Sequence, residues 1–380
     1  MALSTSVPDL NVALVGHKFM GKVHSHAYRT AGMFFPLPVR LRMRVLCGLG
    51  PDLEETRAAY GWERAVSSWE AAVADPEVHL VDICTPDRHH REIAIAAARA
   101  GKHVFCEKPI ALTAGEAREM LACAEASGVR HMVNFVYRGV PALRLARTLV
   151  REGKLGQIYQ FRGLYQQDFA LDPGFPFVWR MDRTEAGHGI LGDKGAHVID
   201  LARFLVGEIV AVTCRTATFV SERKAPGGGL HPVTTPDAAA FVAAFANGAL
   251  GLFELSNMSA GSKNALLVEV NGSLGSLRFD LERLNELELY QKEDREDVRG
   301  FRRIMVTAPS HPLVSHWWPE GHVLGWEHGF VHQVVELAES IAFGRPASPS
   351  FEDGLRCQEV VDALALADRT KAWVDVQRAP

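Results

Sequence analysis

The sequence predicts an α/β protein of two domains: an N-terminal Rossmann-type, doubly wound parallel sheet, and a C-terminal α+β domain on a large, mostly antiparallel open sheet. Up to Tyr137, short apolar runs alternate with helical patterns, as in repeated βαβ units. Beyond it, several strand-like runs follow one another, which predicts antiparallel pairing. A chain of 380 residues also exceeds one ordinary core. We therefore expect domains at 1–138 and 139–380.

The first strand of the domain is expected to be buried on both faces, because its apolar run is continuous. The run 10–15 ends at Gly16, and a helical pattern follows from Met20 to about Thr30. Glycines at 101 and 128 end two later helices. The remaining expected strands are 43–47, 80–84, 103–106 and 130–134, and the remaining helices are 53–60, 68–74, 89–100 and 114–127.

The second domain opens with a helix from Pro141 to about Glu152. Asn247-Gly248, between two apolar runs, predicts a hairpin, and the Gly-rich run 226–229 predicts a loop tip. Two helices close the chain, at 327–343 and at about 352–374. The expected strands are 157–167, 211–220, 238–245, 249–258, 265–271, 274–280 and 286–290.

Composition excludes several classes of protein. A formal charge of −4, from 41 basic and 45 acidic residues, offers no electrostatic footprint for nucleic acid or an anionic membrane. No apolar run approaches the roughly 18 residues that a transmembrane helix needs. The first ten residues lack the pattern of a signal peptide, so we expect a cytoplasmic protein. The six cysteines are scattered without a C-x-x-C pair, which favours reduced thiols and no metal site.

The turn after the first strand carries two outer glycines of a dinucleotide fingerprint. These glycines permit a tight turn and close packing of strand and helix, and the helix N-terminus offers amides to a pyrophosphate. Lys18 replaces the middle glycine, and its ammonium is placed to meet a phosphate. A plain tight turn is the alternative. The candidate cofactor residues of this loop are Gly16, His17, Lys18, Phe19, Met20 and Gly21.

The acid that usually binds the adenosine ribose is absent from the end of the second strand. The sequence there reads Cys47-Gly48-Leu49-Gly50, so Gly48 takes the expected place of the carboxylate. Without an acid nothing repels a 2′-phosphate, and without an arginine nothing attracts one. We expect NAD, with NADP not excluded.

Two further motifs carry chemistry. Glu107-Lys108-Pro109 follows a buried strand at the carboxyl edge of the sheet, where doubly wound folds bind ligands; the alternative is a surface ion pair. Asp193 and His197 are four residues apart in a helical run, so both are expected on one helix face. A neutral imidazole there accepts a hydroxyl proton, and a solvated polar face is the alternative.

Together these motifs resemble the glucose–fructose oxidoreductase and inositol dehydrogenase family (Gfo/Idh/MocA), in its sugar or glycoside dehydrogenase branch. The matching elements are the fingerprint, Thr85-Pro86 with His90, the E-K-P element and D-x-G-x-H, and they occur in family order over nearly the whole chain. Lys18 and the missing acid depart from the family pattern. The resemblance implies the two-domain fold, NAD(P) binding by residues 1–138, and substrate binding and oligomerisation by residues 139–380. The final helices are free to pack on the first domain.

The resemblance also implies roles for individual residues. Lys108, Asp193 and His197 correspond to the groups that surround the reacting carbinol, as catalytic and substrate-binding residues. Tyr137 and His328 are implied to line the sugar pocket, although packing and helix capping are the alternatives. Further cofactor contacts are implied for Gly48, Thr85, Pro86, His90, Glu107, Lys108, Asn134, Trp179 and Arg180.

The expected activity is oxidation of a secondary ring hydroxyl, at C3, of a sugar, amino-sugar glycoside or cyclitol. An acidic rim of Asp168, Asp172, Asp182 and Glu185 would suit an amino sugar, and solvated loop charges are the equal alternative. Two other functions remain open: a glycosidase that retains its NAD and acts through a transient C3 ketone, and a non-catalytic NAD-binding sensor. The open sheet predicts a homodimer or homotetramer through the C-terminal domain.

Overall fold

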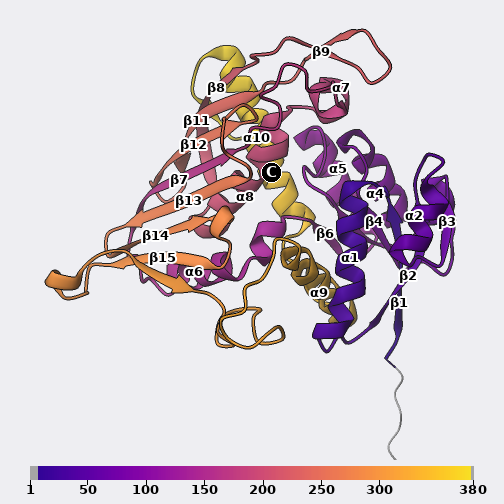
Figure 1. Ribbon diagram of the computed structural model, residues 1–380, viewed down its shortest axis with the longest axis horizontal. Helices are drawn as coiled ribbons and strands as arrows, with labels where there is room; N and C mark the ends of the chain where they lie inside the picture. The colour runs from indigo at the N-terminus through magenta and orange to yellow at the C-terminus, as the bar shows by residue number, and fades with distance from the viewer. Residues whose placement is uncertain (1–6, 378–380) are drawn as a thin grey trace, which may run out of the picture. The chain divides into compact units, whose positions relative to one another are not determined.

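The computed structural model describes residues 7–377, which divide into two compact units. Unit 1 contains the described residues up to 111, together with 115–139 and 325–355. Unit 2 contains 112–114, 140–324 and the described residues from 356 onward. Each unit has its own sheet (Figure 1).

Unit 1 is built on a six-stranded parallel sheet in the order β3-β2-β1-β4-β5-β6. The order reverses between β1 and β4, and ligands of doubly wound folds bind at the carboxyl ends of the strands at such a point. The strands are β1 (Asp9–Val15), β2 (Arg40–Cys47), β3 (Arg64–Val66), β4 (Leu80–Ile83), β5 (His103–Cys106) and β6 (His131–Val133).

Helices connect these strands, and α9 (His328–Phe343) returns late in the chain to pack against α1 (Phe19–Phe34). The core is apolar: the side chains of Val12, Leu46 and Val81 are fully buried. The other helical segments are α2 (Leu53–Tyr60), α3 (Trp69–Ala74), η1 (Asp87–His89), α4 (His90–Arg99), α5 (Ala114–Ala126) and η2 (Val136–Gly139).

Unit 2 is built on a nine-stranded sheet in the order β16-β15-β14-β13-β7-β12-β11-β8-β17. Only the β7–β12 pair of this sheet is parallel within the described chain. Its strands are β7 (Ile158–Gln166), β8 (Ile209–Ala217), β11 (Ala238–Phe245), β12 (Leu250–Ser256), β13 (Ala265–Gly272), β14 (Gly275–Asp280), β15 (Glu286–Gln291), β16 (Arg302–Met305) and β17 (Val374–Asp375).

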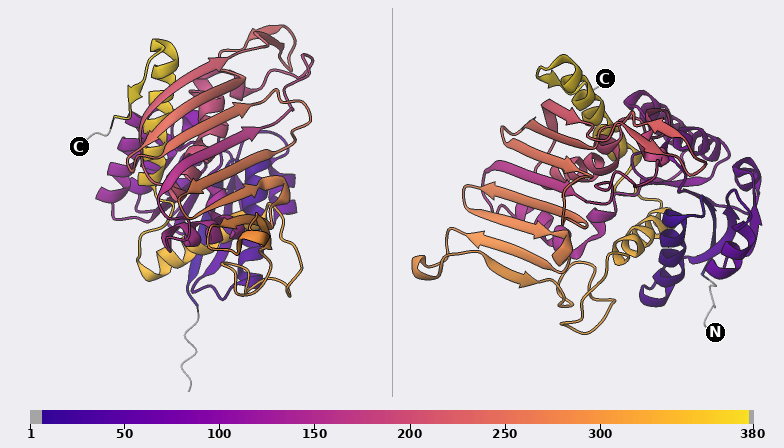
Figure 2. Two further views of the ribbon diagram at one scale, coloured as in Figure 1. Left: turned by 90° about the vertical axis from the view of Figure 1, so that its left-hand side faces the viewer. Right: turned by 45° about the horizontal axis from the view of Figure 1, so that its top comes forward.

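Helices lie on one face of this sheet and leave the other face open (Figure 2). A Cβ atom added at Gly163 of β7 would lie 2.6 Å from Val198 Cγ1, which shows how closely α8 (Ala196–Leu205) approaches the strand. The remaining elements are α6 (Pro141–Arg151), η3 (Trp179–Met181), α7 (Arg183–Ala186), the π-helical segment η4 (Leu191–Gly195), β9 (Glu222–Lys224), β10 (Leu230–Pro232), η5 (Leu281–Arg283), η6 (Glu296–Val298) and α10 (Phe351–Thr370).

The predicted fold class is confirmed, with corrections at the shortest elements. The sequence reading lacks β3, β9, β10, β16 and β17, which span two to four residues each and are too short to show a period. The last helix ends at Thr370, not near Val374, because Lys371 takes a positive φ of 60° and the chain then pairs with β8 as β17.

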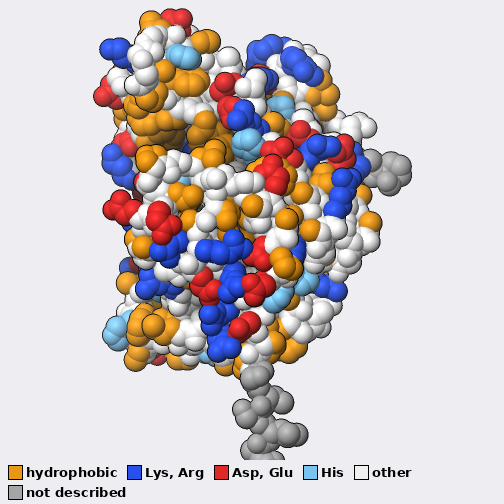
Figure 3. All heavy atoms as spheres, turned by 90° about the vertical axis from the view of Figure 1, so that its right-hand side faces the viewer, with side chains coloured by type: hydrophobic (Ala, Val, Ile, Leu, Met, Phe, Trp, Pro, Cys, Tyr) orange, Lys and Arg blue, Asp and Glu red, His pale blue; other side chains and the backbone are white. Residues whose placement is uncertain are grey.

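Charges of both signs are interspersed on the surface shown in Figure 3. On β2, for example, Arg42 and Arg44 both form ion pairs with Glu63. No helix among residues 7–377 is long and apolar enough to cross a membrane. The six cysteines are free thiols.

Candidate active site

The fingerprint turn joins β1 to α1, and its backbone leaves no room for side chains at the two glycines. Gly16 has a φ of +107°, and a Cβ atom there would lie 2.5 Å from the Cys84 carbonyl oxygen. A Cβ atom at Gly21 would lie 2.0 Å from the Gly16 carbonyl oxygen. Lys18, the N-cap residue, makes no side-chain hydrogen bond to the first turn of α1. The turn therefore has the tight packing that a pyrophosphate-binding loop requires.

The imidazole of His17 occupies the space beside Gly48, where a ribose-binding acid would usually stand. A Cβ atom at Gly48 would lie 2.0 Å from His17 Nδ1, so the buried ring occupies the space in which a side chain at the end of β2 would begin. A carboxylate nevertheless reaches this region from Asp52. Asp52 accepts a hydrogen bond of 2.6 Å from Lys18 Nζ and one of 3.4 Å from His17 Nε2.

The charge of Asp52 is set by these partners. The hydrogen bond from Lys18 holds the pKa of the Asp52 carboxyl below its usual value. The sequence predicted no acidic side chain near this end of β2. The structure places the carboxylate of Asp52 there, from the start of α2, four residues beyond Gly48.

The loop after β4 is tied to the E-K-P loop by His90. Its ring is fully buried, with Nδ1 2.9 Å from the Pro109 carbonyl oxygen and Nε2 3.1 Å from the Thr85 carbonyl oxygen. Burial lowers the pKa of His90, and the two carbonyl oxygens oppose this shift. The hydroxyl of Thr85 is buried and has no hydrogen-bond partner among residues 7–377.

A buried charged network lies at the ends of β4, β5 and β6. His24 of α1 donates from Nδ1 to Asp82 Oδ2 at 2.8 Å and from Nε2 to Glu107 Oε1 at 2.9 Å. Tyr28 donates to the same Asp82 oxygen at 2.8 Å, and Asn134 Nδ2 donates to Glu107 Oε1 at 2.6 Å. Glu107 is thus a buried, multiply bonded carboxylate and not part of a surface ion pair.

The pKa shifts of this network indicate an ionised pair. Burial by itself lowers the pKa of His24, but the charge of Asp82 outweighs it and raises that pKa well above its ordinary value. Burial raises the pKa of Glu107, yet the hydrogen bond from His24 and the charges of His24 and Lys108 bring it below its ordinary value. Both shifts favour an imidazolium facing a carboxylate.

The network fixes the backbone that carries Lys108. The Lys108 N–H donates to Glu107 Oε2 at 3.1 Å, and the Lys108–Pro109 peptide is cis. The Asn134 carbonyl oxygen Oδ1 is buried and has no partner within the described chain. The trio His24, Asp82 and Cys84 has possible metal-ligating atoms within 4.8 Å, but burial raises the pKa of the Cys84 thiol, which disfavours the thiolate that a metal needs.

These features of unit 1 fit a dinucleotide. The fingerprint turn provides a cradle that side chains would fill, and two buried polar atoms, Thr85 Oγ1 and Asn134 Oδ1, await partners at the carboxyl ends of β4 and β6. Both strand ends belong to the edge where doubly wound folds bind cofactors. Asp52 and Lys18 offer a carboxylate and an ammonium on the same loop pair.

Unit 2 brings Asp193 and His197 into a partly buried group of polar side chains. His197 is 9% exposed, and its ring lies 5.8 Å from the ring of Tyr165. Arg180 Nε is 3.8 Å from Asp193 Oδ1, and the Arg180 guanidinium lies 4.3 Å over the ring of Trp179. The pair is therefore not a solvated helix face.

The helix that carries this pair differs from the expectation. Asp193 lies in the π-helical segment η4, and only from Ala196 onward is the helix regular. The i, i+4 spacing of an α-helix thus does not describe the pair, and single-turn π segments of this kind are frequent at functional sites.

The residues expected to line a sugar pocket have local roles in unit 1. Tyr137 is 3% exposed. His328 Nδ1 accepts a hydrogen bond of 3.1 Å from the Gly325 N–H, which precedes α9, so this bond does not cap the first turn of the helix. Trp326 stacks on Phe19 of the fingerprint turn, with ring centroids 6.0 Å apart.

The acidic rim is largely used by the fold. Asp168 accepts from Lys263 Nζ at 2.7 Å, Asp182 caps α7 through the Thr184 N–H, and Asp172 accepts from the Gly174 N–H at 2.7 Å. These carboxylates give no particular support to a cationic substrate.

Comparison with known proteins agrees with this site. Residues 10–135 match the oxidoreductase family with an NAD-binding Rossmann fold, and residues 143–278 match the GFO/IDH/MocA C-terminal domain. A levoglucosan dehydrogenase from Pseudarthrobacter phenanthrenivorans is 39% identical over 384 residues, covering 97% of this chain and 98% of the relative. The chain belongs to the GFO/IDH/MocA family.

Solved members of the GFO/IDH/MocA family share the whole fold. An oxidoreductase domain protein from Kribbella flavida has 46% identity and a TM-score of 0.95, with 98% of this chain and 100% of that chain covered. A levoglucosan dehydrogenase in complex with NADH and levoglucosan has 40% identity and a TM-score of 0.94, with 97% and 100% covered. This GFO/IDH/MocA member is an NAD-dependent dehydrogenase, which confirms the expected cofactor and enzyme class.

Four further candidate functional residues of this dehydrogenase were not predicted from the sequence: Asp52, His24, Asp82 and Lys194. Asp52 is too far from the fingerprint for the usual spacing. His24 and Asp82 belong to a helix and a strand whose patterns look purely structural, and a charged residue inside the apolar run of β4 was the available signal for Asp82. Lys194 lies between the two residues that the D-x-G-x-H motif singles out.

Proposed function

We propose that this dehydrogenase oxidises the C3 hydroxyl of a neutral cyclic sugar such as levoglucosan to a ketone, with NAD as the oxidant. The observation that carries the proposal is the 39% identity to a levoglucosan dehydrogenase along 97% of the chain. The presence of Lys108, Asp193 and His197 at the positions of the family's carbinol-binding groups supports it. An inositol 2-dehydrogenase from Rhizobium meliloti, at 27% identity over 96% of this chain, keeps cyclitols among the substrates to test.

In the proposed reaction, a hydride leaves the carbon of the alcohol and a proton leaves its oxygen. Bound NAD supplies the hydride acceptor. His197 takes the hydroxyl proton, because a neutral imidazole accepts a proton near neutral pH. Lys108 stabilises the developing alkoxide by its positive charge. Asp193, with Arg180 beside one of its oxygens, stays an acceptor and holds a neighbouring substrate hydroxyl.

The position of oxidation is tested by isotopic labelling. Levoglucosan carrying deuterium at C3 is incubated with NAD, and NADH absorbance is followed beside samples labelled at C2 or C4. We expect a slowed rate and deuterium in the NADH only from the C3 label. Deuterium transfer from another carbon would contradict C3 oxidation. Opening of the 1,6-anhydro bond of levoglucosan without net NADH formation would favour the NAD-retaining glycosidase.

The proposed residues are tested by substitution. His197→Ala and Lys108→Met are each expected to lower kcat on the order of 10²–10⁴-fold while NADH still binds. Lys263→Met serves as the control, because Lys263 is 76% exposed and pairs with Asp168. Wild-type activity in His197→Ala would refute the role of His197 as the base. A wild type that binds NADH but oxidises no member of a sugar and cyclitol panel would favour the sensor.

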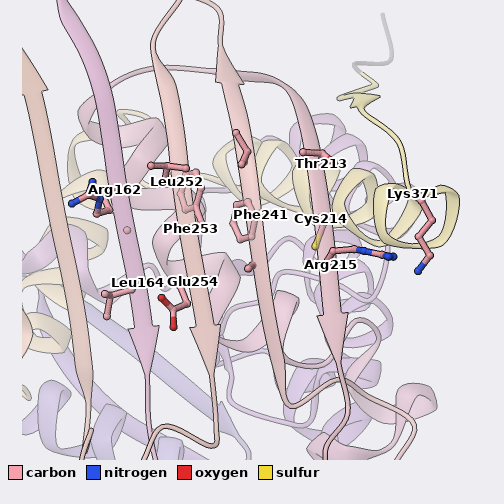
Figure 4. A pocket seen from close by; sticks show the side chains of 13 residues that line it. Arg162, Leu164, Thr213, Cys214, Arg215, Phe241, Leu252, Phe253, Glu254 and Lys371 are labelled. Carbon is pink, nitrogen blue, oxygen red and sulfur yellow. The ribbon is translucent and has the colours of Figure 1, made fainter.

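We also propose that the open face of the nine-stranded sheet pairs with a second copy of the chain, as a dimer or tetramer. The face has a hollow of about 570 Å³ (Figure 4). Its lining combines Leu164 and Leu252 with charges of both signs, such as Arg162 and Glu254, and mixed charge suits pairing of one face with itself. Sedimentation of the wild type and of Leu252→Arg tests this. A concentration-independent monomer in the wild type would refute it.

A further inference from the structure

We infer that Lys194 is a positioning residue that holds the Asp193 carboxylate for the reaction. The inference rests on the proposed function, since Asp193 is there the group that receives a substrate hydroxyl. Its basis is a buried ammonium beside that carboxylate within unit 2.

Lys194 is an exceptional lysine because its side chain is only 2% exposed. Lysine is almost never fully buried unless it is paired, since an ammonium loses its hydration on burial. Here Nζ donates a hydrogen bond to Asn257 Oδ1. It also lies 5.0 Å from the ring centroid of Phe169 and 5.6 Å from that of Tyr165, where the ring faces attract a cation.

This aromatic and amide cage fixes the ammonium next to Asp193. Nζ is 4.0 Å from Asp193 Oδ2, while Arg180 Nε is 3.8 Å from Asp193 Oδ1. The carboxylate, which is 27% exposed, thus has a cation on each oxygen. The two flanking cations limit the rotation of this carboxylate, which can accept a hydrogen bond from a substrate hydroxyl.

The cage also contacts the proposed base. The Tyr165 ring faces Lys194 and lies 5.8 Å from the ring of His197, and its hydroxyl donates to Asn264 Oδ1 at 2.8 Å. One rigid ring therefore touches both groups. A supporting shell of this kind decides whether functional side chains stay within the fraction of an ångström that catalysis needs.

Asp193 and Lys194 are neighbours in the π-helical segment and lie in different environments. Asp193 and Lys194 both lie in η4, yet one is partly exposed and the other is enclosed. Single π-helical turns are rare overall but frequent at functional sites. The enclosed lysine lies beside the residue that the proposed reaction uses.

The test replaces the charge but keeps the volume, in Lys194→Met. We expect kcat on levoglucosan to fall about 10- to 100-fold, as for a small misplacement of a reacting group, with unchanged NADH affinity. A lower melting temperature is also expected, because the substitution leaves Asn257 and Asp193 without their buried cation, so kcat is measured well below the transition of both proteins. Lys263→Met is the control, and it should keep wild-type kcat.

A double-mutant cycle identifies the route of the effect. If Lys194 acts through Asp193, Lys194→Met should lower kcat little further in an Asp193→Asn background. Asn257→Ala removes the acceptor of the Lys194 hydrogen bond and keeps the lysine charge, and it should also lower kcat. If Lys194→Met does not fold, Asn257→Ala serves as the test of the inference.

Three results would overturn the inference: wild-type kcat in Lys194→Met, full additivity with Asp193→Asn, or a fall in melting temperature without a fall in kcat. A wild type inactive on every sugar would refute the proposed function and this inference together. An active wild type with an equally active Lys194→Met would refute this inference alone.

Discussion

Gly48 offers a direct test of how the cofactor loop is built, through the substitution Gly48→Ala. The added Cβ atom would lie 2.0 Å from His17 Nδ1 and 2.8 and 2.9 Å from two further ring atoms. The His17 ring is 3% exposed, so it cannot move aside freely. Overpacking of this kind costs about 1–3 kcal/mol. The displaced ring would also lose its hydrogen bond to Asp52.

We expect Gly48→Ala to lower both the free energy of unfolding and the affinity for NADH. Each 1.4 kcal/mol that reaches the binding step weakens affinity about tenfold. Urea denaturation and NADH fluorescence titration measure the two effects. Gly32→Ala is the matched control, because no heavy atom lies within 4 Å of its added Cβ atom, and the change should stabilise helix α1 by about 0.5–1 kcal/mol.

The double variant Gly48→Ala/His17→Ala makes the test specific. Removal of the ring clears the space for the new methyl group, so the second substitution should recover part of the stability that the first one loses. Additive losses, or wild-type stability and NADH affinity in Gly48→Ala alone, would refute the packing argument.

Three further predictions concern charge. Asp52→Ala should lower kcat/KM for NAD more than for NADP, because a carboxylate repels a 2′-phosphate; an unchanged ratio would exclude Asp52 from cofactor selection. The pKa of His24 is raised, so its stabilisation is complete below its ordinary pKa of 6.5 and is lost as pH rises through the raised value; urea denaturation should show less of this alkaline loss in His24→Gln than in the wild type. Burial lowers the pKa of His103 and of His131 to about 4, so both are expected to destabilise the fold as pH falls from 6.5 toward that value, and His131→Asn should reduce the acid loss.

The sheet of unit 1 was accessible from the sequence because its signals are local. Several of its strands contain a short apolar run, such as 12–15 and 104–106, and the turn after β1 begins with a glycine. The strand 103–106 and the helix 53–60 were placed exactly. The hairpin at Asn247-Gly248 was also predicted, because the Asn-Gly pair favours a tight turn. The structure agrees: Gly248 has a φ of +86°, which a side chain disfavours. The strand β3 was not, because three residues carry no period.

The chemistry of the site was only partly accessible, because its decisive contacts join distant residues. His24 meets Asp82 across 58 positions and Glu107 across 83, and neither spacing leaves a pattern along the chain. The E-K-P motif could be identified, but not the imidazolium that holds its glutamate. In the same way D-x-G-x-H indicated Asp193 and His197, while nothing in the sequence distinguishes the intervening Lys194.

Both units use the same physical device to prepare a side chain for the proposed reaction. In unit 1, the buried His24 holds Glu107, whose carboxylate in turn accepts the Lys108 N–H. In unit 2, the buried Lys194 stands beside Asp193. A buried charge that is paired and hydrogen-bonded is costly to move, because any displacement exposes an uncompensated charge to a medium of low polarity. The groups proposed to act on the carbinol are therefore held by the interiors of their own units, and loop changes can alter the choice of sugar without disturbing them.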